Sequence, residues 1–276
     1  MKTFVLAALL TGITLTSSAQ TDTTATPASD TIRIGGMIII KKPGKDGNES
    51  REVIISNRRR TRLSNLSTNW WIVDLGFANY KDETNYPAAQ QSGFVTSSIG
   101  SKDQLKLRTG KSVNVNIWVF MQKLNLAKHV VNLKYGLGVE LNNYRFSDER
   151  VRFTKNPTTI SLDPALQNAD KNKLAADYVT VPVMLNFNFT PGRYRGFGFS
   201  AGVSAGYLYS ARQKIKMDGD KDKLKDDFNL EKWKLSYIAE LSLGPVRLYG
   251  SMAMKNMWEK GLDQTPYNVG IRFSHF

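Results

Sequence analysis

The sequence predicts an all-β protein, an eight-stranded antiparallel up-and-down transmembrane β-barrel with a short N-terminal periplasmic β-hairpin extension. Eight stretches after Asn69 alternate apolar and polar residues, and strict period two places one set on each face of a strand. The connections between these stretches alternate between long polar segments and short turns, which is typical of bacterial outer-membrane barrels. A secretion signal precedes them, so the predicted location is the outer membrane of a Gram-negative cell.

Residues 1–19 have the features of a signal peptide. Lys2 gives a positive start, a short apolar run extends from Phe4 to Leu15, and small residues precede a cleavage site after Ala19. The run is too short to cross a bilayer as a helix, and no later segment offers about 18 consecutive apolar residues. We therefore expect no helical membrane anchor.

The chain of 276 residues contains no cysteine, which excludes a lipoprotein anchor, disulfides and cysteine metal sites. Its net charge of +14 is spread over the sequence, with one tight cluster at Arg58–Arg62. Because a secreted chain does not normally meet nucleic acid, we expect no nucleic-acid partner. Attraction to outer-membrane lipids and lipopolysaccharide phosphates is one interpretation of the cluster, and a solvated basic linker is the other.

Residues 20–69 are expected to form a periplasmic N-terminal extension that is partly disordered. Residues 20 to about 30 are polar and of low complexity, which favours disorder. Two β-prone runs, 31–40 and 51–56, flank the turn-rich segment 43–48 and predict a hairpin. Since a lone hairpin is marginal in water, it is expected to lean on the barrel or on a periplasmic or secretion-system partner.

The barrel is expected over residues 70–276, with strands near the 9–11 residues that a tilted strand needs to cross a bilayer. The expected strands are 70–80, 112–124, 130–144, 178–189, 197–212, 234–243, 246–254 and 267–276.

The connections predict the orientation of the barrel. Segments 81–111 and 145–177 are long, and 213–233 and 255–266 are of medium length. By contrast, 125–129, 190–196 and 244–245 are short. Bacterial barrels keep short turns in the periplasm and long loops outside, so both termini are expected in the periplasm. Insertion would require the barrel-assembly machinery.

The two faces of the strands predict what each one meets. One row per strand is apolar, with aromatic residues near its ends, which fits lipid contact and interfacial girdles. In the second strand this row is Val113, Val115, Ile117, Val119 and Met121. The opposite rows carry Asp74, Lys134, Glu140, Lys234, Glu240, Arg247 and Arg272. Inside a barrel these charges can pair and fill the lumen, so we expect a plug and not an aqueous pore. Serine in place of inward Gly138 is expected to be mild.

A soluble, lipocalin-like barrel is the rival architecture, because it would place the polar rows outside and the apolar rows around a cavity. The apolar rows are complete in strand after strand and end in aromatic residues, which favours the membrane barrel.

The stretch Tyr178–Leu185, with Pro182 inside a run of apolar residues, resembles a strand of PorT-like outer-membrane β-barrels of Bacteroidetes-type bacteria. Asp74–Phe77 and Tyr267–Phe273 are similar to the opening and closing strands of that family. The resemblance covers about residues 70–276 and implies an outer-membrane barrel, with a link to protein secretion as an accessory. Pro182 also lacks a backbone donor, which suits a bulge or a strand end.

No catalytic, cofactor-binding or metal-binding residues are predicted. Ser274 and His275 have hydrolase residue types but lie at the periplasmic end, and His129 falls in a turn. The acidic segment starting at Asp218 lacks the glycine and the closing glutamate of a calcium loop. We therefore expect a non-enzymatic protein with a structural or interaction role of its surface loops or periplasmic arm. The alternative is an outer-membrane lipid-modifying enzyme.

Overall fold

The computed structural model describes residues 31–34, 37–42, 50–55, 63–193 and 196–274. The chain divides into two compact units, Met1–Arg60 and Thr61–Phe276, and each is described by itself. The predicted signal peptide, the low-complexity segment 20–30 and the arginine cluster 58–62 lie outside the described residues.

The first unit contains a three-stranded antiparallel sheet, not the two-stranded hairpin expected from the sequence. It consists of β1 (Thr31–Ile34), β2 (Met37–Lys42) and β3 (Ser50–Ile55), paired in that order. The run expected as one strand is divided, because Ile34 pairs with Met37 and the chain folds back between them. The two residues between this pair are both glycine in the sequence, a combination that hairpin turns favour.

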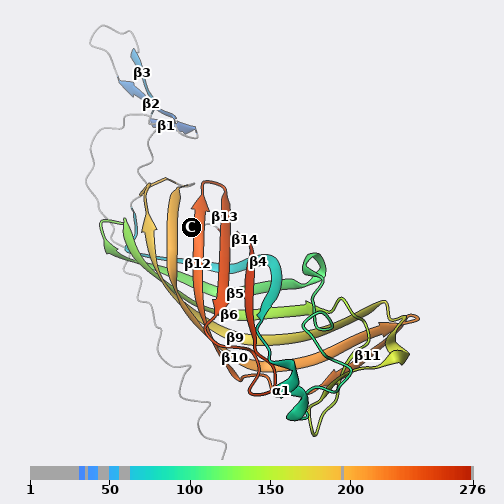
Figure 1. Ribbon diagram of the computed structural model, residues 1–276. Coiled ribbons are helices and arrows are strands. Elements are labelled where there is room, and N and C mark those ends of the chain that lie inside the picture. Colours follow the sequence, from blue (N-terminus) through green and yellow to red (C-terminus); the bar gives the residue numbers. More distant parts are fainter. Residues whose placement is uncertain (1–30, 35–36, 43–49, 56–62, 194–195, 275–276) are drawn as a thin grey trace, which may run out of the picture. The chain divides into compact units, whose positions relative to one another are not determined.

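The second unit is built on a nine-stranded antiparallel sheet in the order β11-β10-β12-β13-β14-β4-β5-β6-β9. Because β9 also pairs with β10, and the last strand β14 pairs with β4, the first strand of this unit, the strands form a closed ring (Figure 1). The closed, all-β antiparallel architecture predicted from the sequence is therefore confirmed. The strand β11 pairs only with the far end of β10 and belongs to a hairpin that the sequence did not predict.

Several strands of the ring are longer than expected. Their bounds are β4 (Leu66–Asp82), β5 (Val113–Ala127), β6 (Val131–Arg145), β9 (Lys171–Asn188), β10 (Phe197–Met217), β12 (Trp233–Leu243), β13 (Val246–Ala253) and β14 (Gln264–Phe273), and β11 is Asp220–Lys225. The strand β10 has 21 residues, about twice the length that a bilayer requires. The extra length lies at the end where the long connections are, so that end projects beyond the part of the barrel that lipid can cover.

Short and long connections alternate around the ring, as expected. The short turns follow β5, β9 and β12, and the longer segments follow β4, β6, β10 and β13. The segments after β4 and β6 contain short elements of their own: α1 (Tyr86–Gln91), η1 (Thr109–Lys111), β7 (Val151–Phe153), β8 (Ile160–Leu162) and η2 (Pro164–Leu166). Both Leu66 and Phe273 lie at the short-turn end, so the barrel starts and finishes on the same side.

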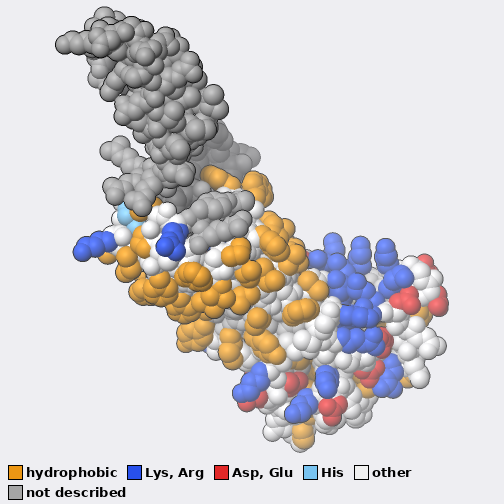
Figure 2. Space-filling model, turned by 90° about the horizontal axis from the view of Figure 1, so that it is seen from above, with side chains coloured by type: hydrophobic (Ala, Val, Ile, Leu, Met, Phe, Trp, Pro, Cys, Tyr) orange, Lys and Arg blue, Asp and Glu red, His pale blue; other side chains and the backbone are white. Residues whose placement is uncertain are grey.

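Hydrophobic side chains form an outer band around the barrel, visible as the orange zone in Figure 2. On β9 the outward row is Val179, Val181, Val183, Leu185 and Phe187, and all five are exposed. Aromatic pairs occur towards both ends of the band: Tyr207 with Trp233 at 5.0 Å between ring centroids, and Trp70 with Phe120 at 6.0 Å. No helix in the described part of the chain is long and apolar enough to cross a membrane.

Irregularities in two neighbouring strands, a β-bulge in β5 and a residue with positive φ in β4, interrupt the period-two pattern and correct the predicted faces. Between Trp118 and Phe120 the register of β5 against β6 slips by one residue. The outward row therefore continues at Phe120, and Met121, expected on the lipid face, is fully buried inside the barrel. In β4 the corresponding irregularity is Trp71, which has a positive φ of 56° and leaves both it and Trp70 exposed.

Two further expectations about single residues are corrected by the backbone. A Cβ at Gly138 would lie 2.5 Å from the carbonyl oxygen of Ile117 and 2.8 Å from Cα of Trp118, so serine cannot be mild there. Pro182 lies neither at a bulge nor at a strand end. The register of β6 against β9 is unchanged on both sides of it, but the pairing is interrupted opposite Gly136 and Leu137.

Candidate functional site: the filled interior and the capped mouth

The interior of the ring is organised around Arg272 and Asp74. Arg272 on β14 lies directly opposite Asp74 on β4 and donates two hydrogen bonds to it, Nε to Oδ1 at 2.7 Å and Nη2 to Oδ2 at 2.8 Å. The same carboxylate accepts hydrogen bonds from Asn116 and from the indole nitrogen of Trp118. Asp74 is therefore fully buried yet satisfied, as a buried charge has to be.

Two more acids extend this network across the ring. Glu240 on β12 accepts from Nη1 of Arg272 at 2.6 Å and from Nζ of Lys134 at 2.7 and 2.8 Å. Glu140 on β6 pairs with Lys234 and also accepts a hydrogen bond from Asn268 at 3.0 Å. These contacts join strands from opposite sides of the barrel, because long side chains meet in the middle of the ring.

The pairing of inward charges predicted from the sequence is confirmed: Asp74, Lys134, Glu140, Lys234, Glu240 and Arg272 form four ion pairs. Arg247 donates hydrogen bonds to the backbone oxygen and the hydroxyl of Ser274. The lumen is therefore packed with ion-paired side chains at mid-height.

Above this layer the long connections fold together into a cap, which we define as residues 83–112, 146–170, 218–232 and 254–263. Phe153 of β7 is its centre and is almost completely buried. The Phe153 ring stacks on Trp258 at 6.0 Å with an interplanar angle of 12°, and its centroid lies 5.3 Å from Phe228 and 5.9 Å from Phe146. Phe94 packs edge-on against Trp258 at 5.7 Å. All four connections thus contribute an aromatic ring to one cluster.

Local capping and polar contacts fix the segments of the cap. The helix α1 begins after Asn85, whose side chain accepts a hydrogen bond from the backbone N–H of Ala88. Tyr86 donates to Asp82 at 2.8 Å, and burial together with this carboxylate raises the pKa of Tyr86 well above its ordinary value. Gln213 reaches from β10 to accept from the backbone N–H of Phe153 at 3.0 Å. The cap is consequently a packed structure joined to the barrel strands.

The sequence reasoning missed this core, because it treated the connections as solvated loops. A signal was present: the connections carry large apolar residues that a solvated loop does not need. The buried ones include Tyr86, Phe94, Ile99, Leu105, Leu107, Phe146, Val151, Phe153, Ile160, Phe228, Leu230, Trp258 and Leu262.

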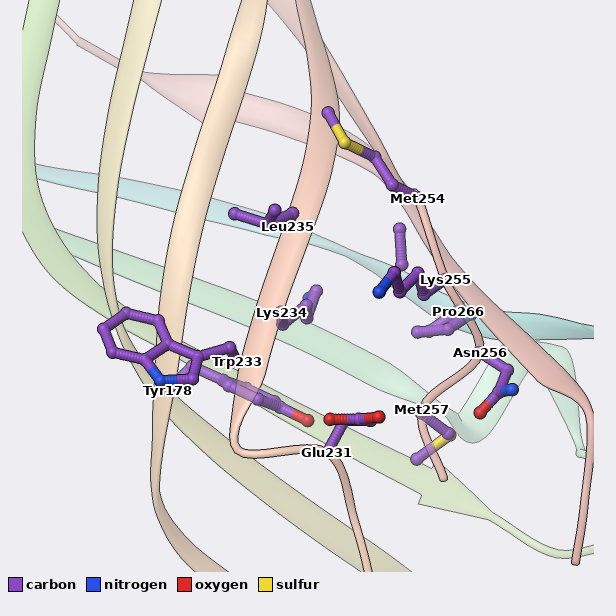
Figure 3. A pocket seen from close by; sticks show the side chains of 11 residues that line it. Tyr178, Glu231, Trp233, Lys234, Leu235, Met254, Lys255, Asn256, Met257 and Pro266 are labelled. Carbon is purple, nitrogen blue, oxygen red and sulfur yellow. The ribbon is translucent and has the colours of Figure 1, made fainter. Parts of the chain in front are cut away.

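A cavity of about 260 Å³ opens in the barrel wall where β12 and β13 separate (Figure 3). Pairing between these strands stops at Ser236 and Ala253, and Pro266 of the next strand has no N–H to offer. Most of the lining is apolar, with Leu235 and Met254 at the outer side. Three charged residues also line the cavity: Lys234, which is ion-paired with Glu140, and Glu231 and Lys255.

The residues weighed as chemical candidates do not come together. His129 lies in the short turn between β5 and β6 with a φ of 57°, and Ser274 is held by Arg247, while His275 lies outside the described residues. Asp220 and Asp222 lie on the strand β11 and not in a calcium-type loop. Among the described residues, no group of three or more His, Cys, Asp or Glu side chains is placed to hold a metal ion.

Comparison with known proteins agrees with this architecture. The model of a family described as outer membrane protein beta-barrel domain matches residues 76–253. A search of curated proteins finds no match. The matched segment runs from β4 to the end of β13 and covers most of the ring and most of the cap. The chain therefore belongs to the outer membrane protein beta-barrel domain family and is an integral protein of the outer membrane.

Proposed function

We propose that this protein is a non-enzymatic, non-conducting barrel that acts through interactions of its cap. In this proposal the eight strands of the closed ring cross the membrane. The short turns and both termini are periplasmic, and the cap faces the outside of the cell. The observation that carries the proposal is the cap itself, in which four connections fold around Phe153 above an interior already filled by ion pairs. A pore needs neither a folded cap nor a filled interior, whereas a rigid binding surface needs a folded cap.

The use of the buried acids supports a non-enzymatic role. General acids and bases act from accessible positions with a suitable proton affinity. Asp74 and Glu240 are both bound to Arg272, and Glu140 is bound to Lys234, so each carboxylate already has a cationic partner. If one of these carboxylates left its cationic partner to act in catalysis, a buried charge would remain unpaired.

The proposed orientation can be tested on intact cells, and the absence of cysteine from the sequence makes the test clean. Single variants Lys260→Cys in the cap and Arg193→Cys in the short turn after β9 place a thiol at each end. A membrane-impermeant maleimide should label Lys260→Cys in intact cells and Arg193→Cys only after the outer membrane is permeabilised. The reverse labelling would refute the orientation.

A deletion strain separates the proposal from the lipid-modifying alternative. We expect the mass spectrum of lipid A to be unchanged by the deletion. The deletion could instead change the mass of lipid A. If the wild-type chain reverses that change and a variant of a cavity residue such as Lys255→Ala does not, the protein is an enzyme that acts on lipid.

An accessory role in protein secretion is a second candidate. The strand Tyr178–Leu185 resembles PorT-like barrels, and the separate sheet β1–β3 would provide a periplasmic arm for a secretion-system partner. Deletion of residues 31–55, with the signal peptide and barrel retained, should then abolish export of cargo while surface labelling of Lys260→Cys persists. Unchanged export would remove this candidate.

A further inference from the structure

The outward face of the strand extensions carries basic residues directly opposite one another. In one row, Lys173 of β9 lies between Arg145 of β6 and Lys214 of β10, and Lys214 in turn faces Lys223 of β11. The next row, one step further from the membrane band, is Lys171, Lys216 and Lys221. We call these two rows the basic ladder. Figure 2 shows Lys and Arg side chains gathered beyond the hydrophobic band, at the end where β11 lies.

A β-bulge places these residues on the outer face. Tyr209 has no partner in the register of β10 against β9, which shifts between Leu208 and Ser210. Before the bulge, odd-numbered residues such as Tyr207 point outward, and after it the even-numbered Lys214 does so. The opposite face of the extension holds the buried Gln213 and Ile215, so the sheet there has one packed face and one basic face.

Such an arrangement costs stability on its own, since like charges directly opposite on a sheet repel. Lys216 is relieved by Asp170 at 3.1 Å. Lys214 and Lys223 have no carboxylate within ion-pair distance among the described residues, because Asp222 alternates to the other face of β11. Partial burial, followed by the nearby Lys171 and Lys214, lowers the pKa of Lys173 to about 8.

The ladder begins where the lipid-facing surface ends. Tyr207 and Tyr209 are exposed at the upper edge of the apolar band. From Tyr209 to Lys214 the strand rises about 16 Å, at about 3.3 Å per residue. Because barrel strands are tilted, this is on the order of 11 Å along the membrane normal, which lies within or just above the headgroup region.

We propose that the basic ladder is a binding site for the phosphate groups of phosphorylated glycolipids in the outer leaflet. The inference rests on the proposed function, because it requires the cap to face outside. Phosphates between the rows would neutralise the repulsion between opposed lysines, and the apolar band below would contact the acyl chains of the same lipid. An acidic polymer or free phosphate would meet the charge of the ladder but make no use of the adjoining apolar band.

The test uses the purified full chain in neutral detergent, with diphosphorylated lipid A as the probe. The ladder variant is Lys173→Gln, Lys214→Gln and Lys223→Gln together. The control variant, Lys102→Gln, Lys155→Gln and Lys260→Gln, removes the same charge from exposed cap positions. Affinity should fall on the order of 100-fold in the ladder variant, since each lysine near an anionic lipid surface contributes a factor of about five. The control should stay within about twofold of wild type.

Each other outcome is decisive. Equal affinity of ladder and control variants would overturn the proposal, as would equal binding of dephosphorylated lipid A. Tight binding of inorganic phosphate or of an acidic polysaccharide, with the same loss in the ladder variant, would refute the lipid as ligand. Loss of folding is excluded if the ladder variant melts at or above the wild-type temperature at low salt. If the purified protein binds lipid A as expected but Lys260→Cys is not labelled on intact cells, only the proposed orientation is refuted.

Discussion

Arg272 and Asp74, 198 residues apart in sequence, form a two-hydrogen-bond ion pair across the line where the last strand of the ring meets the first. The pair lies at 5% and 0% side-chain exposure and is shared with Glu240. The closing contact of the barrel is therefore electrostatic on its inner face and apolar on its outer face.

Removing one partner of this pair should destabilise the barrel strongly. We expect Arg272→Met to lower the free energy of unfolding by about 3–5 kcal/mol, because it leaves Asp74 buried without its cation. The double variant Arg272→Met with Asp74→Leu should cost less than the sum of the two single variants. Urea unfolding in lipid vesicles measures all three. The control Arg152→Met breaks an exposed cap pair with Asp163 and should cost less than about 1 kcal/mol. Additive single effects would show that the two residues are not coupled.

Charge on the outer band should be costly at mid-strand. Val183→Arg and Leu137→Arg should each lower the free energy of unfolding in vesicles by about 2–4 kcal/mol if they lie near the bilayer midplane. Val183→Leu is the matched control, because it changes volume without charge. If both arginine variants unfold like wild type, the assignment of this face to lipid is wrong.

The purified barrel should not conduct. In planar bilayers we expect no large, stable current steps, since ion-paired side chains fill the ring at the level of Glu240 and Lys134. Replacing residues 150–162 of the cap by a short glycine-serine linker should leave the barrel closed, because the ion-pair layer lies below the cap. Current steps that appear only in this variant would show that the cap, and not the ion-pair layer, blocks the flow of ions.

The cap should depend on its central ring. Phe153→Ala should destabilise the cap by about 3–5 kcal/mol, because it removes contacts with rings from three connections. We expect trypsin to cut the cap of vesicle-inserted protein much faster than in wild type, while the barrel strands stay protected. Lys155→Arg, an exposed change two residues away that keeps a trypsin site, should leave the rate of cutting unaltered. Equal rates for both variants would contradict a cooperatively packed cap.

The affinity of the basic ladder for lipid A should fall with rising pH. Lys173, with a pKa of about 8, is charged below that value and loses its charge above it, whereas a phosphate monoester, with a second pKa of about 6, stays fully charged. Binding should therefore weaken above pH 8, and Lys173→Arg should flatten the curve because arginine keeps its charge. A titration of lipid A binding between pH 7 and 10 measures both. The charged groups that face Lys173 are Lys171 and Asp177 on its own strand, Arg145 on β6, and Arg212 and Lys214 on β10.

Much of the barrel could be predicted from period two alone, because lipid and a polar interior impose opposite demands on successive residues. The pattern worked along β6 and β9, where no extra residue interrupts the alternation. It failed at Met121, because a bulge inserts one residue and no local chemistry announces it. The hairpin strand β11 escaped prediction since five of its six residues are charged.

The interior charges were predictable as a set, because a charge in an otherwise apolar barrel strand has only one favourable face. Their partners were not, since Arg272 and Asp74 meet only when the ring closes. The cap was missed because its rings come from four segments without periodicity. Phe94, Phe153, Phe228 and Trp258 form a cluster only in three dimensions.

The extra residue at Tyr209 lets a single continuous strand serve two surroundings. Without it, the lysines of β10 would turn towards the packed side and Gln213 and Ile215 would turn towards lipid headgroups. The position of this inserted residue thus decides where the outward row of β10 changes from apolar to basic. Moving that residue by two positions along β10 would move this change by one outward-facing residue, which offers a way to fit the barrel to a thicker or thinner bilayer.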